Sequence, residues 1–169
     1  MKLIIMSDNH NNIKAVEEIY TRHFKEADLF LHCGDSQLPY NHPLLSKFLK
    51  VGGNCDYDRS YPKELTKDLT ENHRLFMTHG HHYDVKMSLD RLGYKGLETG
   101  ANIVCFGHSH CVEVEMVKHI LFINPGSVAF PRNTREKTYA TLTIAKEKLI
   151  VNILQVDHGK VLKTYEFLQ

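Results

Sequence analysis

The stretch that decides the fold is Leu3-Ile4-Ile5-Met6-Ser7-Asp8-Asn9-His10, near the start of the chain. Its four uninterrupted apolar residues predict a short strand that is buried on both faces, as in a parallel sheet covered by helices. Asp8 and His10 follow this strand, at the edge where open α/β sheets place their ligands. Because side chains two positions apart in an extended chain point the same way, both are expected to face one point.

Four later stretches repeat this plan of an apolar strand that ends in a small polar cluster. We expect strands over 28–33, 48–51, 74–78 and 102–106, followed by Gly34-Asp35, Gly52-Gly53-Asn54-Cys55-Asp56, His79-Gly80-His81-His82 and Gly107-His108-Ser109-His110. Each polar residue alone has an ordinary structural explanation, such as a helix cap or a turn. Since the tips of parallel strands converge, the joint pattern predicts one crevice lined by Asp8, His10, Asp35, Asn54, His79, His108 and His110.

Helices are expected between these strands. Apolar residues at helical spacing predict a helix over 12–24, capped by Asn11 or Asn12, and the strand–helix–strand order makes the first two strands parallel. A short helix is expected over 43–48. Asp84 is expected to cap a further helix that carries Val85, Leu89 and Leu92 and fades at Gly96 and Gly100. Residues 63–70 alternate weakly and are expected to pair with 74–78.

The last third of the chain changes to antiparallel patterning. Residues 112–117 and 119–123 alternate around a tight turn, and Asn124-Pro125-Gly126-Ser127 is a turn by composition. Strands over 138–145, 149–156 and 160–168 predict a meander without intervening helices. We therefore expect these strands to form much of a second sheet packed on the first, within a single domain over 1–169.

Composition narrows the functional classes. Apolar residues make up 42% of the 169 residues, and the net charge is +1, so disorder is not expected. No basic run indicates a nucleic-acid or membrane surface, and the N-terminal apolar run is too short for a signal peptide. The four cysteines form no CxxC pair, so a reduced, cytoplasmic protein is expected, with Cys33, Cys55, Cys105 and Cys111 as free thiols.

Seven ligand-type residues exceed the four that one zinc ion usually takes. They suit two divalent ions that share a bridging carboxylate. The mixture of imidazole, carboxylate and amide ligands favours Mn, Ni, Zn or Fe over Mg alone. Two such ions about 3.5–4 Å apart form the hydrolytic clamp that acts on phosphate esters.

The ordered blocks Asp8-x-His10, Gly34-Asp35, Gly53-Asn54-x-Asp56, His79-Gly80 and Gly107-His108-x-His110 resemble the signature of the calcineurin-like metallophosphoesterases. Chain length and the Gly53-Asn54-Cys55-Asp56 block resemble the small single-domain, YfcE-like phosphodiesterase branch of that superfamily. The resemblance implies an α/β fold, an αββα sandwich of two mixed β-sheets flanked by helices, with the meander strands in the second sheet.

The resemblance also implies roles for single residues. Asp8, His10, Asp35 and His110 would hold the first ion, and Asp35, Asn54, His79 and His108 the second, with Asp35 bridging. A hydroxide between the ions would attack phosphorus in line, in a phosphodiester or a phosphomonoester. Catalytic positions are then Asp35, Asn54 and Cys55, and the residues expected around them are Asp56, His81, Asn124 and Ser127.

Cys55 departs from the family pattern, because many members have a histidine there that serves the leaving group or the phosphate. The thiol is either a small filler or a weak acid and metal ligand, and His81 or His82 are candidates to replace the missing imidazole. Asp56 is then expected to anchor its loop. The absence of this histidine also leaves open a second, non-enzymatic function: a protein-binding scaffold on the same fold, as in a retromer subunit. The complete ligand set weighs against it, and the sequence leaves a homo-oligomer open.

Overall fold

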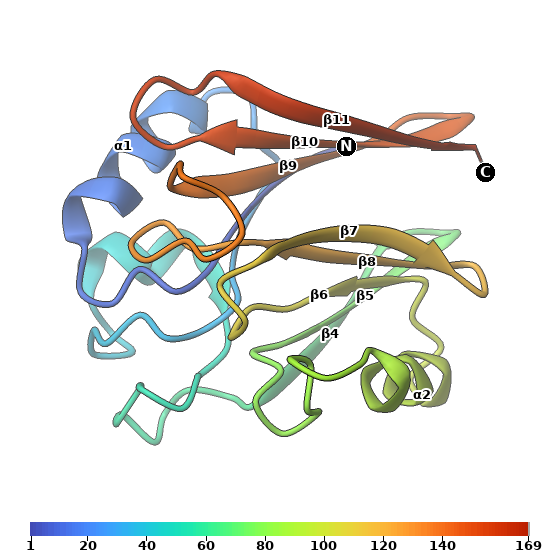
Figure 1. Cartoon of the computed structure of the whole chain (residues 1–169), viewed down its shortest axis with the longest axis horizontal. Helices are drawn as coiled ribbons and strands as arrows, with labels where there is room; N and C mark the ends of the chain where they lie inside the picture. Colours follow the sequence, from blue (N-terminus) through green and yellow to red (C-terminus); the bar gives the residue numbers. More distant parts are fainter. Residues whose placement is uncertain (169) are drawn as a thin grey trace.

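The computed structural model describes residues 1–168 and has two β-sheets packed face to face, with helices on their outer faces (Figure 1). The first sheet has the strand order β11-β10-β9-β1-β2-β3, and the second has the order β4-β5-β6-β8-β7. Both sheets contain parallel and antiparallel pairs, which confirms the predicted fold class. The expected unit over 1–169 includes Gln169, which lies outside the described residues.

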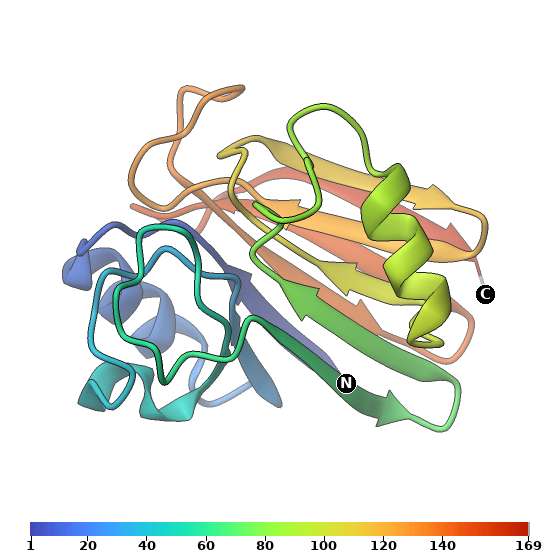
Figure 2. The ribbon, with the colours of Figure 1, turned by 90° about the horizontal axis from the view of Figure 1, so that it is seen from below.

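The predicted strand bounds agree with the structure to within two residues. The first sheet comprises β1 (Lys2–Met6), β2 (Leu29–His32), β3 (Phe48–Lys50), β9 (Thr138–Ile144), β10 (Lys148–Gln155) and β11 (Val161–Leu168). The second comprises β4 (Glu64–Thr70), β5 (His73–Thr78), β6 (Ile103–Cys105), β7 (Val112–Val117) and β8 (Ile120–Pro125). Figure 2 shows α2 (Asp90–Glu98) lying across the second sheet.

Strand β1 is apolar on both faces because it separates two cores. Leu3 and Ile5 belong to the core between the two sheets, whereas Ile4 and Met6 belong to a second core on the other face of the first sheet. All four side chains are fully buried. The strand alternation therefore accounts for the uninterrupted apolar run.

Helix α1 (Ile13–His23) covers the outer face of the first sheet, beside the short 3-10 helix η1 (Pro43–Lys47). The Asn12 side chain accepts a hydrogen bond from the Ala15 N–H at 3.2 Å, which confirms the predicted cap. Val16 and Ile19 bury the apolar stripe of the helix against β1 and β2. None of the helices in residues 1–168 is long and apolar enough to span a bilayer.

The prediction that the C-terminal meander forms the second sheet is wrong. Strand β9 pairs antiparallel with β1, with Leu142 opposite Leu3, so β9, β10 and β11 extend the first sheet. The second sheet is formed by residues 64–125 instead. The physical reason is that β1 is buried on both faces and has a free edge opposite β2, whose backbone groups need partners. The five polar strand tips therefore come from two sheets.

The expected helix cap at Asp84 is also wrong. Asp84 has a φ of 54°, in the left-handed region, and α2 begins only at Asp90. Residues 81–87 form turns. Val85 is nevertheless buried in the core beneath α2, together with Leu92. The apolar positions were predicted correctly, but the intervening chain reaches the core through turns instead of a helix.

Candidate metal centre

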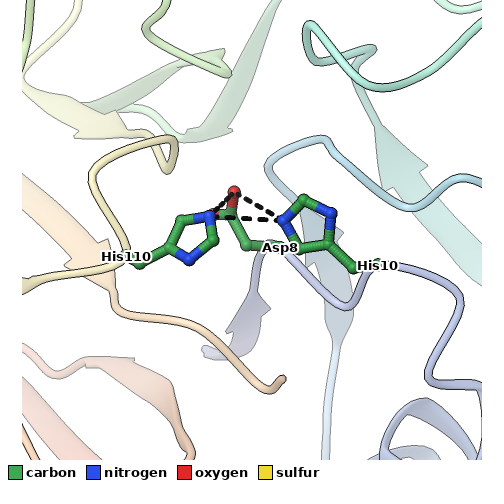
Figure 3. Close-up of side chains that lie close together, drawn as sticks. All are labelled: Asp8, His10 and His110. Carbon is green, nitrogen blue, oxygen red and sulfur yellow. Dashed lines mark hydrogen bonds and ion pairs between the residues drawn. The ribbon is translucent and has the colours of Figure 1, made fainter. Parts of the chain in front are cut away.

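Predicted ligand residues converge at one end of the sandwich, where loops of both sheets meet. Asp8 follows β1, Asp35 follows β2, His79 follows β5 and His110 follows β6, and all four are buried. Oδ1 of Asp8 lies 3.1 Å from Nε2 of His110, and Oδ2 of Asp35 lies 3.3 Å from Nε2 of His79. Figure 3 shows Asp8, His10 and His110 pointing toward one another. Their ligand atoms lie within 4.8 Å of one another, as do those of Asp8, Asp35 and His79.

Three imidazoles are oriented by acceptors on the side away from the carboxylates. Nδ1 of His10, His79 and His110 lies next to the Gln37 Oε1, the Cys33 carbonyl and the Phe130 carbonyl, at 3.3, 2.7 and 2.8 Å. On the opposite side of each ring, Nε2 is directed toward Asp8 and Asp35. Histidines that bind metals are held in this way, with the other ring nitrogen donating to a carbonyl or carboxylate.

Two polar atoms at the centre are buried without a hydrogen-bond partner in residues 1–168. They are Oδ1 of Asp8 and Nε2 of His79, which lie 3.9 Å apart. Buried polar atoms are rarely left unsatisfied. A cation between them would satisfy both atoms, so the donor set fits a divalent ion.

The titration of the inner residues reflects the same geometry. Burial disfavours charge on His79, but the neighbouring carboxylates of Asp35 and Asp8 raise its pKa. The Asp8 carboxylate also raises the pKa of His110. Burial would raise the pKa of both aspartates, yet these imidazoles hold the pKa of Asp8 and Asp35 below the usual range. Metal binding to such pairs displaces protons.

The remaining predicted residues lie nearer the solvent. Asn54 is exposed, and its Nδ2 donates to Sγ of Cys55 at 3.3 Å. The Cys55 N–H donates to Oδ1 of Asp35 at 2.7 Å, and its Sγ lies within 4.8 Å of ligand atoms of His10 and Asp35. The backbone N–H of His108 donates to Oδ2 of Asp8 at 3.1 Å. The structure thus brings Cys55 to the carboxylates, whereas His108 reaches Asp8 through its backbone N–H and the Asn54 amide contacts Cys55. Within residues 1–168, the His108 ring is not among the groups placed to share an ion with Asp8 or Asp35.

Burial also changes the proton affinity of these outer groups. It lowers the pKa of His81 and of His108 to about 4, and a charge on His79 lowers both further. The rings of His81 and His108 lie 5.4 and 5.2 Å from the ring of His79. Burial and the negative charge of Asp35 raise the pKa of Cys55 to about 11. Without bound ions, the outer histidines are neutral at pH 7 and Cys55 is a thiol.

Left-handed backbone conformations cluster at the centre. Five of the predicted ligands have positive φ: Asp8 (56°), His10 (41°), Asp35 (54°), His108 (66°) and His110 (60°). This conformation costs a residue with a Cβ roughly 1–2 kcal/mol. Strained residues gather where the surrounding structure holds them for a function, so the clustering itself indicates a site.

Two glycines allow the loops to approach the carboxylates. A Cβ at Gly53 would lie 2.1 Å from Oδ1 of Asp35, and a Cβ at Gly107 would lie 2.0 Å from Oγ of Ser7. Neither position can hold a larger residue without moving a carboxylate loop. The glycines beside the ligands are therefore needed for close approach.

Asp56 anchors its loop, as the sequence predicted. Its Oδ2 accepts from the N–H groups of Asp35 and Gly53, both at 2.8 Å. Its Oδ1 accepts from Oγ of Ser36 and from the N–H of Gln37. One carboxylate thus fixes the loops on both sides of Asp35.

Asn124 and Ser127 hold the loops on the opposite side and are fully buried. The Asn124 amide donates to the Gly107 carbonyl and to Oγ of Ser109, both at 2.9 Å. Ser127 Oγ donates to the Asp8 carbonyl at 2.8 Å. Both residues therefore support ligand loops and do not point into the centre.

His32 is a supporting residue that the sequence analysis missed. It is fully buried at the end of β2, where Nδ1 accepts from the Gly34 N–H and Nε2 lies 2.9 Å from Oδ1 of Asn9. Burial lowers its pKa to about 4. A histidine at the end of an apolar strand was the available signal. Phe130 was also missed, because its carbonyl makes the contact to His110 and a backbone contact has no sequence signal.

Comparison with known proteins agrees with this geometry. Residues 1–147 match the model of the calcineurin-like phosphoesterase superfamily domain. The chain is similar to the probable metallophosphoesterase YsnB of Bacillus subtilis, with 40% identity and 89% of each chain covered. It is also similar to the phosphodiesterase MJ0936 of Methanocaldococcus jannaschii, with 32% identity over 75% of this chain and 83% of that protein.

Solved structures share the fold. A predicted phosphoesterase from Streptococcus pneumoniae superposes with a TM-score of 0.93 at 34% identity, covering 99% of this chain and 97% of that one. Vps29 of Entamoeba histolytica in complex with Zn²⁺ has a TM-score of 0.76 at 17% identity, covering 99% of each chain. The second likeness concerns the fold alone.

Proposed function

The chain belongs to the calcineurin-like phosphoesterase superfamily, and from this premise we propose that it hydrolyses phosphodiesters at a centre of two divalent ions. It is a metal-dependent phosphoesterase, that is, a hydrolase of ester bonds. The observation that carries the proposal is the orientation of three imidazoles, whose Nε2 atoms all face Asp8 and Asp35. The likeness to the phosphodiesterase MJ0936 supports diesters as the substrate class.

We assign Asp8, His10, Asp35 and His110 to one ion, and Asp35, Asn54, His79 and His108 to the other. Asp35 is assigned to both ions, because its Oδ2 lies 3.3 Å from Nε2 of His79 and 3.9 Å from Nε2 of His10. Imidazole and carboxylate ligands together favour Mn, Ni, Zn or Fe. Binding of Asn54 needs its exposed amide to turn from Cys55 toward Asp35.

Bound divalent ions would supply positive charge that polarises a phosphoryl group and lowers the pKa of water. The reaction we propose is in-line displacement at phosphorus by a water-derived nucleophile, without a covalent enzyme intermediate. The chain's own contribution is positioning. Hydrogen bonds to Cys33 and Phe130 hold the rings of His79 and His110, and the Cys55 N–H holds Asp35. Pre-oriented ligands of this kind reduce the reorganisation that accompanies reaction.

The proposal is tested with chromogenic esters at defined metal content. With Mn or Ni, bis(p-nitrophenyl) phosphate should be hydrolysed faster than p-nitrophenyl phosphate. Asp8→Ala and His108→Ala should each abolish turnover, whereas Lys146→Gln, an exposed change in the turn between β9 and β10, should leave it unchanged. A metal-loaded protein that cleaves no ester in a broad panel, yet binds a stable protein partner, would support the scaffold alternative instead.

A further inference from the structure

A cleft of about 410 Å³ opens beside the metal centre. Its walls are formed by eight residues between Gly52 and Lys63 and by His81 and His82. The cleft adjoins the centre, because the ring of His81 lies 5.4 Å from the ring of His79 and Asp56 accepts from the Asp35 N–H. An ester arm attached to a phosphorus at the centre is therefore within reach of this cleft.

Two cations in the cleft have no carboxylate partner. Arg59 and Lys63 are exposed, and within residues 1–168 neither forms an ion pair at 4.0 Å or less. The guanidinium and ammonium donors of the cleft are thus free for a ligand.

The two carboxylates of the cleft are occupied by the chain itself. Asp56 accepts four hydrogen bonds, which fills its lone-pair sites. Oδ2 of Asp58 accepts from the Tyr40 N–H, and Oδ1 accepts from the Ser60 N–H. The formal charges of the cleft balance, but the acceptors face the backbone while the cationic donors face solvent. The cleft is therefore suited to an anion and not to a cation.

A third donor comes from His81. Its Nδ1 is buried and has no hydrogen-bond partner among residues 1–168, while its ring packs on His82 with centroids 3.9 Å apart. A buried ring nitrogen without a partner needs an explanation, and a ligand oxygen would satisfy it once the ring turns Nδ1 toward the cleft.

We propose that this cleft binds a second phosphate group of the substrate, separate from the phosphorus that reacts. Arg59, Lys63 and His81 would each donate to one of its oxygens, a match between three donors and a group with three free acceptors. The inference rests on the proposed function, because it assigns the cleft to an ester arm. The substrate class becomes phosphodiesters in which one alcohol arm carries a phosphate.

The first test measures binding and needs no turnover. Isothermal titration of the metal-free protein compares thymidine 3′,5′-bisphosphate with thymidine 5′-phosphate. The bisphosphate should bind about fivefold more tightly, the size expected for exposed charge-assisted contacts, and added salt should reduce the preference. The double variant Arg59→Gln/Lys63→Gln should lose the preference, and Lys146→Gln should keep it. Equal affinities in the wild type would overturn the assignment.

The second test separates this inference from the proposed function. Two p-nitrophenyl esters of thymidine 5′-phosphate, with and without a 3′-phosphate, release the same chromophore. The kcat/KM ratio should favour the phosphorylated ester about fivefold and fall toward one in the double variant. If both esters are cleaved with equal kcat/KM, the cleft assignment fails and the hydrolase stands. If neither is cleaved while the bisphosphate preference persists, the hydrolase fails and the anion site stands.

Discussion

The inner and outer parts of the candidate metal centre differ in how the fold holds them. The inner set is buried, and its members contact one another or backbone groups of neighbouring loops: Asp8, Asp35, His79 and His110. The outer set is half-buried or exposed and makes fewer contacts: Asn54, Cys55, His81 and His108. The inner positions are therefore determined by folding, whereas the outer side chains can adjust to a ligand.

This difference suggests a division of roles. Ligands whose orientation is fixed by neighbouring groups bind metal more tightly, and loss of such support costs 10–100-fold in affinity or activity. We therefore expect the inner set to decide whether ions bind. The outer set and the adjoining cleft should decide which esters are cleaved. Four predictions test this division, from the largest expected effect to the smallest.

Among these variants, Asp35→Asn should cause the largest loss of turnover. The amide oxygen can still accept from the Cys55 N–H, so the loop is retained, but the negative charge between the two imidazole groups is lost. Turnover of bis(p-nitrophenyl) phosphate should fall by more than about 100-fold. Asp68→Asn removes an exposed carboxylate at the far end of β4 and serves as the matched control. Comparable turnover in the two variants would contradict a decisive role for the inner set.

Acid should lower the free energy of unfolding because His32, which is buried beneath the inner set, resists protonation in the folded protein. Burial lowers its folded pKa to about 4, whereas an unfolded histidine titrates near ~6.5. Between these values the unfolded chain binds more protons, so stability falls as pH drops, by at most roughly 3 kcal/mol for this group. His32→Asn, whose side-chain oxygen can still accept from the Gly34 N–H, should lose this part of the slope.

The measurement for His32 is urea unfolding of the metal-free protein at pH 4.5 and pH 7, in wild type and variant. The raised pKa values of His79 and His110 oppose the effect, but they do so in both proteins and cancel in the comparison. Parallel slopes in the two proteins would show that His32 does not control the acid sensitivity.

Cys55→His should change substrate range in the outer set. A well-placed general acid contributes about 10²–10⁴-fold, and imidazole titrates near neutral pH, whereas burial and Asp35 raise the pKa of this thiol to about 11. An alkoxide leaving group needs a proton and nitrophenolate does not. The kcat for 2′,3′-cyclic nucleotides should rise at least about tenfold, with little change on nitrophenyl diesters. Equal changes on both classes, at matched metal occupancy, would mean that Cys55 only fills space.

The reactivity of the four cysteine thiols should distinguish buried positions from half-buried ones, and this test needs no activity assay. All four cysteines are free, with Cys33 and Cys105 buried and Cys55 and Cys111 half-buried. Titration with a thiol reagent under denaturing, non-reducing conditions should count four. In the native protein, Cys55 and Cys111 should react well before the other two. A native disulfide would contradict the prediction of a reducing, cytoplasmic environment.

Much of this arrangement could be predicted from local pattern. The apolar run over Leu3–Met6, the Asn12 cap and the polar residues at strand tips each depend on neighbours in sequence. The placement of β9 could not be predicted in this way, because an antiparallel meander has the same pattern in either sheet. Its partner is set by the free edge of β1, a feature of tertiary structure.

The candidate site, too, could be predicted only where a side chain carries the signal. Side chains with ligand chemistry were recognisable at Asp8, Asp35 and His79, but the groups that orient the imidazoles were not. The Cys33 and Phe130 carbonyls are backbone atoms, and any residue can supply them. The predicted helix cap at Asp84 was wrong for a related reason: Asp84 has a left-handed backbone, and the next residue, Val85, packs beside Gly80.

Elemental analysis of the purified protein tests the two-ion centre most directly. Wild type is reconstituted separately with Mn, Ni and Zn, freed of excess metal, and measured for ions per chain. The arrangement of Asp8 and Asp35 among inward-facing imidazoles predicts two ions per chain, and Asp35→Asn should lose at least one of them. A wild-type protein that never exceeds one ion per chain with any of the three metals would contradict the two-ion centre.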